Sequence, residues 1–161
     1  MVLPSGVIVK AGVVWSDAAL QFIRRFRQKV PSEVTILVNS VTRTPEAQAS
    51  AMVTKYQYAE ARSPGGGAAD IRKTYGSKAE SFLSTPVTVE NWARIVRELH
   101  DSGRAFRDGH LEGTAMDVHI KTLPPSWIPL LIEGARRAGG SPVIEANPPH
   151  LHVDGFSRAI A

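Results

Sequence analysis

The sequence predicts an α+β fold in which a small antiparallel sheet is flanked by helices. Helical hydrophobic periodicity dominates the first two thirds of the chain, whereas short apolar segments typical of strands gather in the last third. The chain is 161 residues long, which suits one compact domain, and its sequence contains neither a repeat nor a linker. We therefore expect residues 1–161 to form a single domain.

A first helix is expected to begin at Ser16 and to end before Pro31. Serine is a favoured N-cap residue, and proline cannot continue a helix. Between them, apolar residues recur at helical spacing: Leu20, Ile23, Phe26 and Val30. The next segment, residues 34–41, is apolar and β-branched, so it predicts a buried strand.

A second helix is expected from Thr44 to about Glu60. Threonine suits the N-cap, and Pro45 suits the first turn. The glycine-rich segment 63–67 predicts a loop. It lacks the Gly-Lys-Ser/Thr ending of a phosphate-binding loop, so we expect no nucleotide site there.

Two further helices are expected in the middle of the chain. One is short and covers residues 68–75. The other is capped by Thr88, carries Trp92 and Leu99 on one apolar face, and ends before Gly103.

The pattern then changes to short strands, which favours the α+β class over alternating α/β. Strands are expected over residues 105–107, 115–120, 143–145 and 151–153. A helix over residues 126–138 interrupts them, with Pro129 in its first turn.

The composition narrows the chemistry that the chain can perform. It has no cysteine, which excludes disulfides, thiolate zinc fingers, iron–sulfur clusters and cysteine nucleophiles. Any metal site must therefore use histidine and carboxylate ligands. The net charge of +4 is compatible with nucleic acid, anionic membranes or anionic cell-wall polymers as partners, but a positive excess of this size is also typical of an ordinary globular domain, and we favour that interpretation. No apolar segment reaches the roughly 20 residues of a membrane span, and no signal peptide is evident, so we expect no membrane insertion.

Four of the five histidines lie in the last third of the chain, near two aspartates. His110 and Asp117 are seven positions apart and reach one metal only if the chain turns between them; Gly113 supplies the backbone freedom for that turn. His150 and His152 are two positions apart on an expected strand, so both face the same way.

Two imidazole nitrogens and one carboxylate oxygen suit zinc better than magnesium or calcium. Three protein ligands leave tetrahedral zinc an open position for water, as in catalytic sites. A competing pattern is His152-Val-Asp154, which matches part of the iron site of two-histidine, one-carboxylate oxygenases. Those sites need a further histidine downstream, and the chain contains none after His152.

Three separated segments resemble one family. They are Ser40-Val-Thr-Arg43-Thr-Pro-Glu46, then His110-Leu-Glu-Gly113-Thr-Ala115-Met-Asp117, then His150-Leu-His152. This order is similar to that of the zinc D-Ala-D-Ala metallopeptidases, a superfamily with lysostaphin-type and murein endopeptidases, phage L-alanyl-D-glutamate endolysins and the hedgehog amino-terminal domain. The resemblance implies a fold of the hedgehog or D-Ala-D-Ala peptidase type.

The resemblance also implies roles for individual residues. His110, Asp117 and His152 would bind zinc, and His150 would be the general base or stabilise the transition state. The arginine corresponding to Arg43 would contact the substrate or its carboxylate, as a guanidinium does with two parallel hydrogen bonds.

Three positions depart from the family pattern. Asp108 stands where many relatives have serine, and Thr42 replaces the aromatic residue before the arginine. Pro149 occupies the place of a carboxylate base used by other relatives. Glu145, the nearest upstream carboxylate, is therefore the alternative to His150 as the base.

The function implied is that of a zinc metallopeptidase that hydrolyses an amide bond in peptidoglycan stem peptides or cross-links, as a carboxypeptidase or an endopeptidase. A phage lysin that leaves the host cytoplasm through a holin, or a hydrolase carried by the virion with phage proteins as partners, would fit. Nucleic acid is not an expected partner, and the oligomeric state stays open. The alternative is a non-catalytic, zinc-stabilised binding or structural module, such as a phage tail component, because the hedgehog domain shows that a fold alone does not decide activity.

Overall fold

The computed structural model describes residues 1–101, 109–146 and 148–156. Its contacts divide the chain into two compact units. The sheet unit comprises Met1–Thr42 and Asp108–Ala161, and the helical unit comprises Arg43–Arg107. The expected strand over 105–107, the helix stop at Gly103 and the departure at Asp108 lie outside the described residues.

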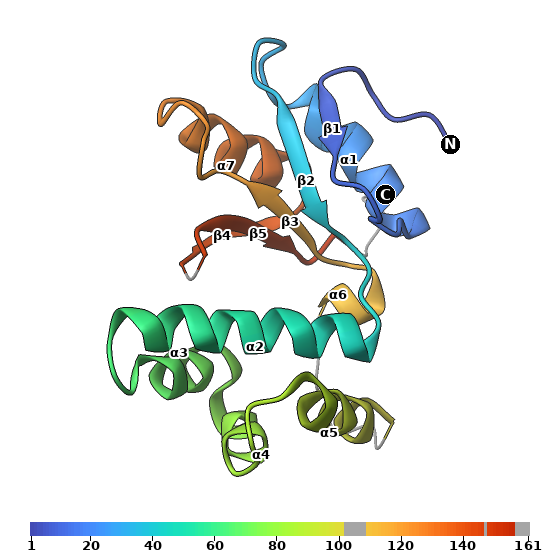
Figure 1. Cartoon of the computed structure of the whole chain (residues 1–161). Coiled ribbons are helices and arrows are strands. Elements are labelled where there is room, and N and C mark those ends of the chain that lie inside the picture. The colour runs from blue at the N-terminus through green and yellow to red at the C-terminus, as the bar shows by residue number, and fades with distance from the viewer. Residues whose placement is uncertain (102–108, 147, 157–161) are drawn as a thin grey trace. The chain divides into compact units, whose positions relative to one another are not determined.

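The described part of the sheet unit contains a five-stranded sheet of order β1-β2-β3-β5-β4 (Figure 1). Its strands are β1 (Val7–Val9), β2 (Ile36–Ser40), β3 (Met116–His119), β4 (Ser141–Glu145) and β5 (His150–Asp154). The predicted α+β class is confirmed. The sheet is mixed rather than antiparallel, because β1 pairs in parallel with β2 while the other pairs are antiparallel. The chain runs from β1 to β2 through a helix, and such a crossover makes two strands parallel.

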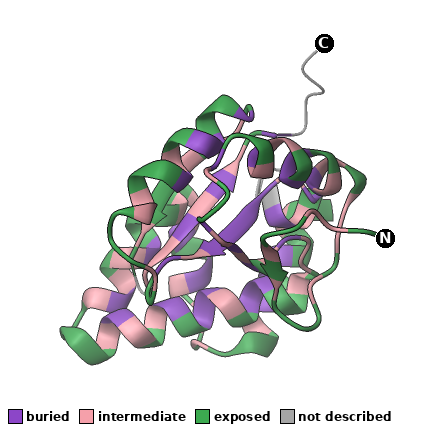
Figure 2. Ribbon diagram, turned by 90° about the horizontal axis from the view of Figure 1, so that it is seen from above, coloured by how far each residue is buried: buried purple, intermediate pink, exposed green. Residues whose placement is uncertain are grey.

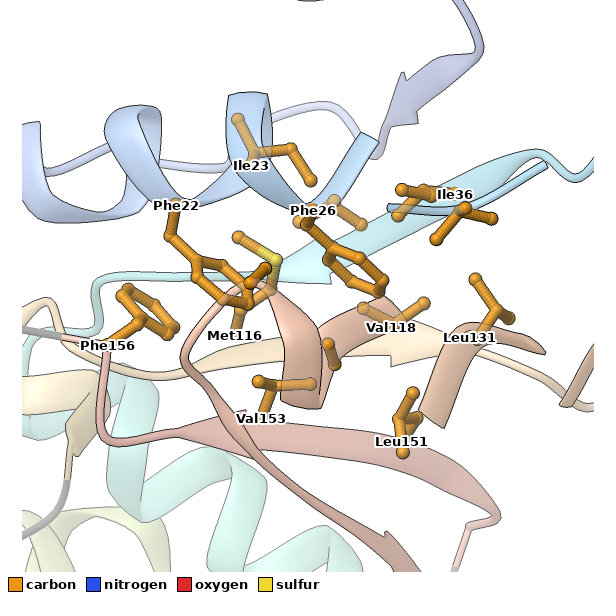
Figure 3. Close-up of a cluster of buried hydrophobic side chains, with 14 of the residues drawn as sticks. Phe22, Ile23, Phe26, Ile36, Met116, Val118, Leu131, Leu151, Val153 and Phe156 are labelled. Atoms are coloured by element: carbon orange, nitrogen blue, oxygen red, sulfur yellow. The ribbon is translucent and has the colours of Figure 1, made fainter. Parts of the chain in front are cut away.

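Two helices, α1 (Asp17–Gln28) and α7 (Trp127–Arg137), pack against one face of this sheet (Figure 1). Ser16 caps α1 as predicted, since its hydroxyl accepts a hydrogen bond from the Ala19 N–H at 3.1 Å. A cluster of buried apolar side chains lies between the helices and the sheet (Figure 3). It includes Phe22, Ile23 and Phe26 of α1, Leu131 of α7, and Phe156, which stacks on Phe22 with ring centroids 4.4 Å apart.

Buried residues alternate with more exposed ones along β5, and β3 supplies buried apolar side chains to the same core (Figure 2). Met116, Val118, Leu151 and Val153 all have exposed fractions of 0%. Since neighbouring side chains of a strand point to opposite faces, the residues between them face away from the core. The periodicity that builds the core thus places the polar residues of β3 and β5 on the other face.

The described part of the helical unit consists of helices of unequal length around an aromatic centre. They are α2 (Pro45–Arg62), α3 (Gly66–Tyr75), α4 (Ala79–Leu83) and α5 (Val89–Asp101), with a 3₁₀ turn η1 (Gly76–Lys78) between α3 and α4. Thr44 and Thr88 cap α2 and α5 as predicted, accepting from the Ala47 N–H at 3.1 Å and the Asn91 N–H at 3.2 Å. None of the described helices is long and apolar enough to cross a bilayer.

Close packing joins α2 to α3 in this unit. A Cβ atom on Gly67 would lie 2.8 Å from the Tyr56 carbonyl oxygen, so only glycine allows this approach. Trp92 is fully buried and lies edge-on to Phe82, with ring centroids 5.4 Å apart. A nearly buried ion pair joins Lys55 to Asp70 at 3.2 Å.

Candidate metal centre

The predicted turn between His110 and Asp117 is present. His110 lies on the short helix α6 (Gly109–Glu112), Gly113 follows with a φ of +72°, and Asp117 lies on β3. A residue with a side chain adopts this φ only at a cost, so glycine is what allows the sharp reversal. His110 and Asp117 are both buried, with exposed fractions of 2% and 6%. The Nε2 atom of His110 lies 3.2 Å from Asp117 Oδ1.

His152 is brought to the same place by the sheet. It pairs directly with Asp117 across β3 and β5, so their side chains share a face. The Nδ1 atom of His152 lies 3.0 Å from Asp117 Oδ1. One ligand atom from each of His110, Asp117 and His152 can be chosen so that all three lie within 4.8 Å of one another.

This donor set fits a divalent transition metal. Two neutral imidazoles and one carboxylate are ligands for such ions, and three ligands leave room for water or a substrate. The Nδ1 atom of His110 lies 2.6 Å from the Val41 carbonyl oxygen. A carbonyl only accepts, so Nδ1 carries the proton and Nε2 faces the site with its lone pair. Sequence reasoning missed this contact, because a backbone acceptor leaves no signature in the side chains.

His150 and Glu145 form a second pair beside the three ligands. They are directly opposed across β5 and β4, and His150 Nε2 lies 3.0 Å from Glu145 Oε2. The same Nε2 lies 3.6 Å from Asp117 Oδ1. The Nδ1 of His150 donates to the Pro148 carbonyl at 2.7 Å. The structure therefore brings together both residues that the sequence proposes as the base.

The pKa values of both histidines on β5 are raised. Burial lowers the pKa of His152, but its hydrogen bond to Asp117 and the charges of Asp117, Glu145 and Asp154 outweigh burial and raise it to about 9. For His150, burial again lowers the pKa, while the hydrogen bond to Glu145, the charge of Asp117 and the Pro148 carbonyl together raise it. Without a metal, His152 therefore holds a proton where a metal would bind.

Other polar residues of this region lie at its margin. Asp154 Oδ2 is 3.4 Å from His152 Nε2, and the Asp154 side chain is 51% exposed. His119 faces the same side of the sheet as His150, but its Nε2 contacts Thr122 Oγ1 at 2.7 Å.

Arg43, the predicted substrate-binding residue, begins the helical unit, where its guanidinium donates to Gln48 Oε1 at 3.1 Å. Its contact with a substrate stays a prediction.

Comparisons with known protein families, with curated proteins and with solved structures find no match for this chain. The chemistry of the three-residue cluster and the pair beside it therefore carries the functional argument. Among the described residues, the chain holds a group of His110, Asp117 and His152 that can bind a metal ion.

Proposed function

We propose that the chain is a zinc-dependent peptidase that hydrolyses an amide bond in peptidoglycan stem peptides or cross-links. The observation that carries this proposal is the convergence of two imidazoles on one buried carboxylate, with a histidine–glutamate pair 3.0 Å apart beside them. The order of the matching motifs along the chain supports the peptidoglycan substrate. Either a carboxypeptidase or an endopeptidase fits this chemistry.

His110 Nε2, His152 Nδ1 and an oxygen of Asp117 would hold the zinc ion. Bound zinc supplies a Lewis acid that polarises the scissile carbonyl and makes water more acidic. Asp154 lies near the outer nitrogen of His152 and helps to orient that ring. The carbonyl of Val41 does the same for His110.

His150 and Glu145 would move the protons. Because Nδ1 of His150 donates to Pro148, Nε2 is the atom that exchanges a proton with the reaction. Glu145 Oε2 lies against that atom, so the two candidate bases share one proton path. With His150 neutral and Glu145 ionised, the pair would accept a proton from the attacking water, and the His150 imidazolium formed in this way would stabilise negative charge or protonate the leaving amine. Arg43 is proposed to bind a substrate carboxylate.

A phage lysin or a virion-associated hydrolase is the setting that we propose for this activity. The zinc-stabilised, non-catalytic module is the competing function. Both contain the same zinc ligands, so the presence of zinc does not separate them.

Hydrolysis of purified peptidoglycan, with and without a chelator, tests the proposal. The zinc-loaded chain should release new amino groups, and mass spectrometry of the products identifies the cleaved bond. His150→Ala should keep stoichiometric zinc but lose about 100-fold or more of the rate, as expected for a lost proton-transfer group. His119→Ala is the matched control on the same face and should stay within about twofold of the wild type. No release of amines at any zinc loading would favour the non-catalytic module.

A further inference from the structure

The hydroxyl group of Ser16 makes two hydrogen bonds that lead to different parts of the sheet unit. It accepts from the Ala19 N–H at 3.1 Å, which caps helix α1. It also donates to the carbonyl oxygen of Gly113 at 2.5 Å. Gly113 lies 97 positions away in the sequence. The start of α1 is thereby joined to the turn that separates two of the three metal ligands.

The approach between Ser16 and Gly113 is close enough to require glycine. A Cβ atom on Gly113 would lie 2.8 Å from the Cβ of Ser16 and 3.1 Å from its Oγ. Gly113 is buried, so its carbonyl oxygen depends on a protein donor in place of water. The contact is therefore built into the fold and is not a chance approach of two exposed groups.

The two ligands on either side of Gly113 are held by other elements. His110 is held through its ring by the Val41 carbonyl, and Asp117 is held by the pairing of β3 with β5. The backbone between these two ligands passes through Gly113, whose φ is +72°. Glycine has no side chain to restrict its φ and ψ angles, so this position has the greatest conformational freedom of the segment. The Ser16 hydroxyl restrains the backbone at this glycine.

We propose that Ser16 is a positioning residue for the metal centre. By holding the Gly113 carbonyl, its hydroxyl keeps the turn in the conformation that places His110 and Asp117 at a common point before a metal arrives. The inference rests on the proposed zinc site but does not depend on peptidase activity. A turn ordered in advance costs less entropy on binding, so loss of the hydroxyl should weaken zinc binding.

Two variants separate this role from capping of the helix. Ser16→Asp keeps a good N-cap acceptor but has no proton to give to Gly113, and Ser16→Gly also lacks the donor while remaining a tolerated N-cap. Both variants should bind zinc about tenfold more weakly. This is the lower end of the loss in metal affinity that follows when a group supporting a metal ligand is removed. Ser16→Thr retains a hydroxyl and should restore the affinity.

Thr88→Ala is the matched control. Thr88 caps α5 through the Asn91 N–H at 3.2 Å and belongs to the helical unit, so its loss removes a helix cap without removing a contact to the Gly113 turn. This variant should lose stability, measured by thermal unfolding of the zinc-free chain, and keep the zinc affinity of the wild type.

Competition with a chromophoric zinc chelator, applied to the full chain without substrate, gives these affinities. The expected result is weaker binding by Ser16→Asp and Ser16→Gly with wild-type binding by Ser16→Thr and Thr88→Ala. Wild-type zinc affinity in both donor-lacking variants would overturn the inference, as would failure of both to fold, because that outcome assigns Ser16 to the fold itself. Failure of the wild type to hydrolyse peptidoglycan would overturn the proposed activity and leave these zinc affinities as the test of Ser16.

Discussion

Buried polar groups are treated differently in the two units. In the helical unit, two buried or nearly buried polar side chains each meet another side chain: Lys55 lies 3.2 Å from Asp70, and Gln48 accepts from Arg43 at 3.1 Å. In the sheet unit one atom, Asp117 Oδ1, lies within 3.0 to 3.6 Å of nitrogens from three imidazoles.

A single carboxylate oxygen surrounded by three imidazoles is more than charge balance requires. Bringing these groups out of water costs free energy, and a purely structural pairing would need only one cation for one carboxylate. Convergence of this kind is typical of sites that bind a metal or move protons. The helical unit thus shows pairwise polar contacts, whereas the sheet unit gathers three ligand atoms that can hold a metal ion.

Removal of a metal ligand should have the largest effect and should act on the sheet unit alone. His152→Ala leaves two of the three ligands, so we expect zinc affinity to fall by about 1,000-fold or more, because two protein ligands hold the ion far less tightly than three. Elemental analysis after dialysis checks this. His119→Ala, which alters a histidine on the same face, should keep its zinc. Stoichiometric zinc in the His152→Ala chain would remove His152 from the ligand set.

A cavity in the helical unit should have the next largest effect and should leave the metal centre intact. Phe82 is fully buried against Trp92, so Phe82→Ala should lower the free energy of unfolding by about 4 kcal/mol. Denaturant unfolding of the zinc-free chain measures this change, and a chelator competition measures zinc affinity. A parallel loss of zinc affinity in the folded variant would contradict the contrast between the two units.

The pH dependence should be the smallest effect and should have opposite signs for stability and for zinc binding. The pKa of His152 is raised to about 9 in the metal-free fold, above its ordinary value near 6.5. The corresponding stabilisation, about 3 kcal/mol, is fully present below the unfolded pKa and is lost as pH rises through the folded pKa.

Zinc must displace the same proton, so its apparent affinity should rise by up to about tenfold per pH unit between pH 7 and pH 9. Denaturant unfolding without metal and chelator competition, each repeated across this range, test the two signs. Zinc affinity independent of pH over that interval would contradict a protonated His152 in the metal-free chain.

The local features of the fold could be read from the sequence. Serine or threonine caps predicted the starts of α1, α2 and α5, a β-branched segment predicted β2, and short apolar segments predicted β3, β4 and β5. These signals depend on only a few neighbouring residues, so they can be recognised without knowledge of how the rest of the chain folds. The sequence likewise predicted a turn at Gly113, between His110 and Asp117, and the structure has a turn there.

Features that depend on distant partners could not be predicted in this way. Strand β1 has only three residues, which is too short to give a clear strand pattern in the sequence. Its extended conformation depends on pairing with β2. Helix α4 has five residues and is too short to be stable alone. The Val41 carbonyl and the Ser16 hydroxyl act on residues far away in sequence, which no local pattern encodes.

The hydrogen bond from His110 to the Val41 carbonyl also has a topological consequence. Residues Arg43–Arg107 leave the sheet unit immediately after Val41 and Thr42, and the chain resumes just before His110. In the sequence, the whole helical unit is thus an insertion between Val41, which accepts the hydrogen bond, and His110, which makes it. Because the entropy of closing a loop grows only slowly with its length, the insertion can lengthen or shorten through evolution at little cost. The orientation of the His110 ring would persist through such changes for as long as its hydrogen bond to the Val41 carbonyl is kept.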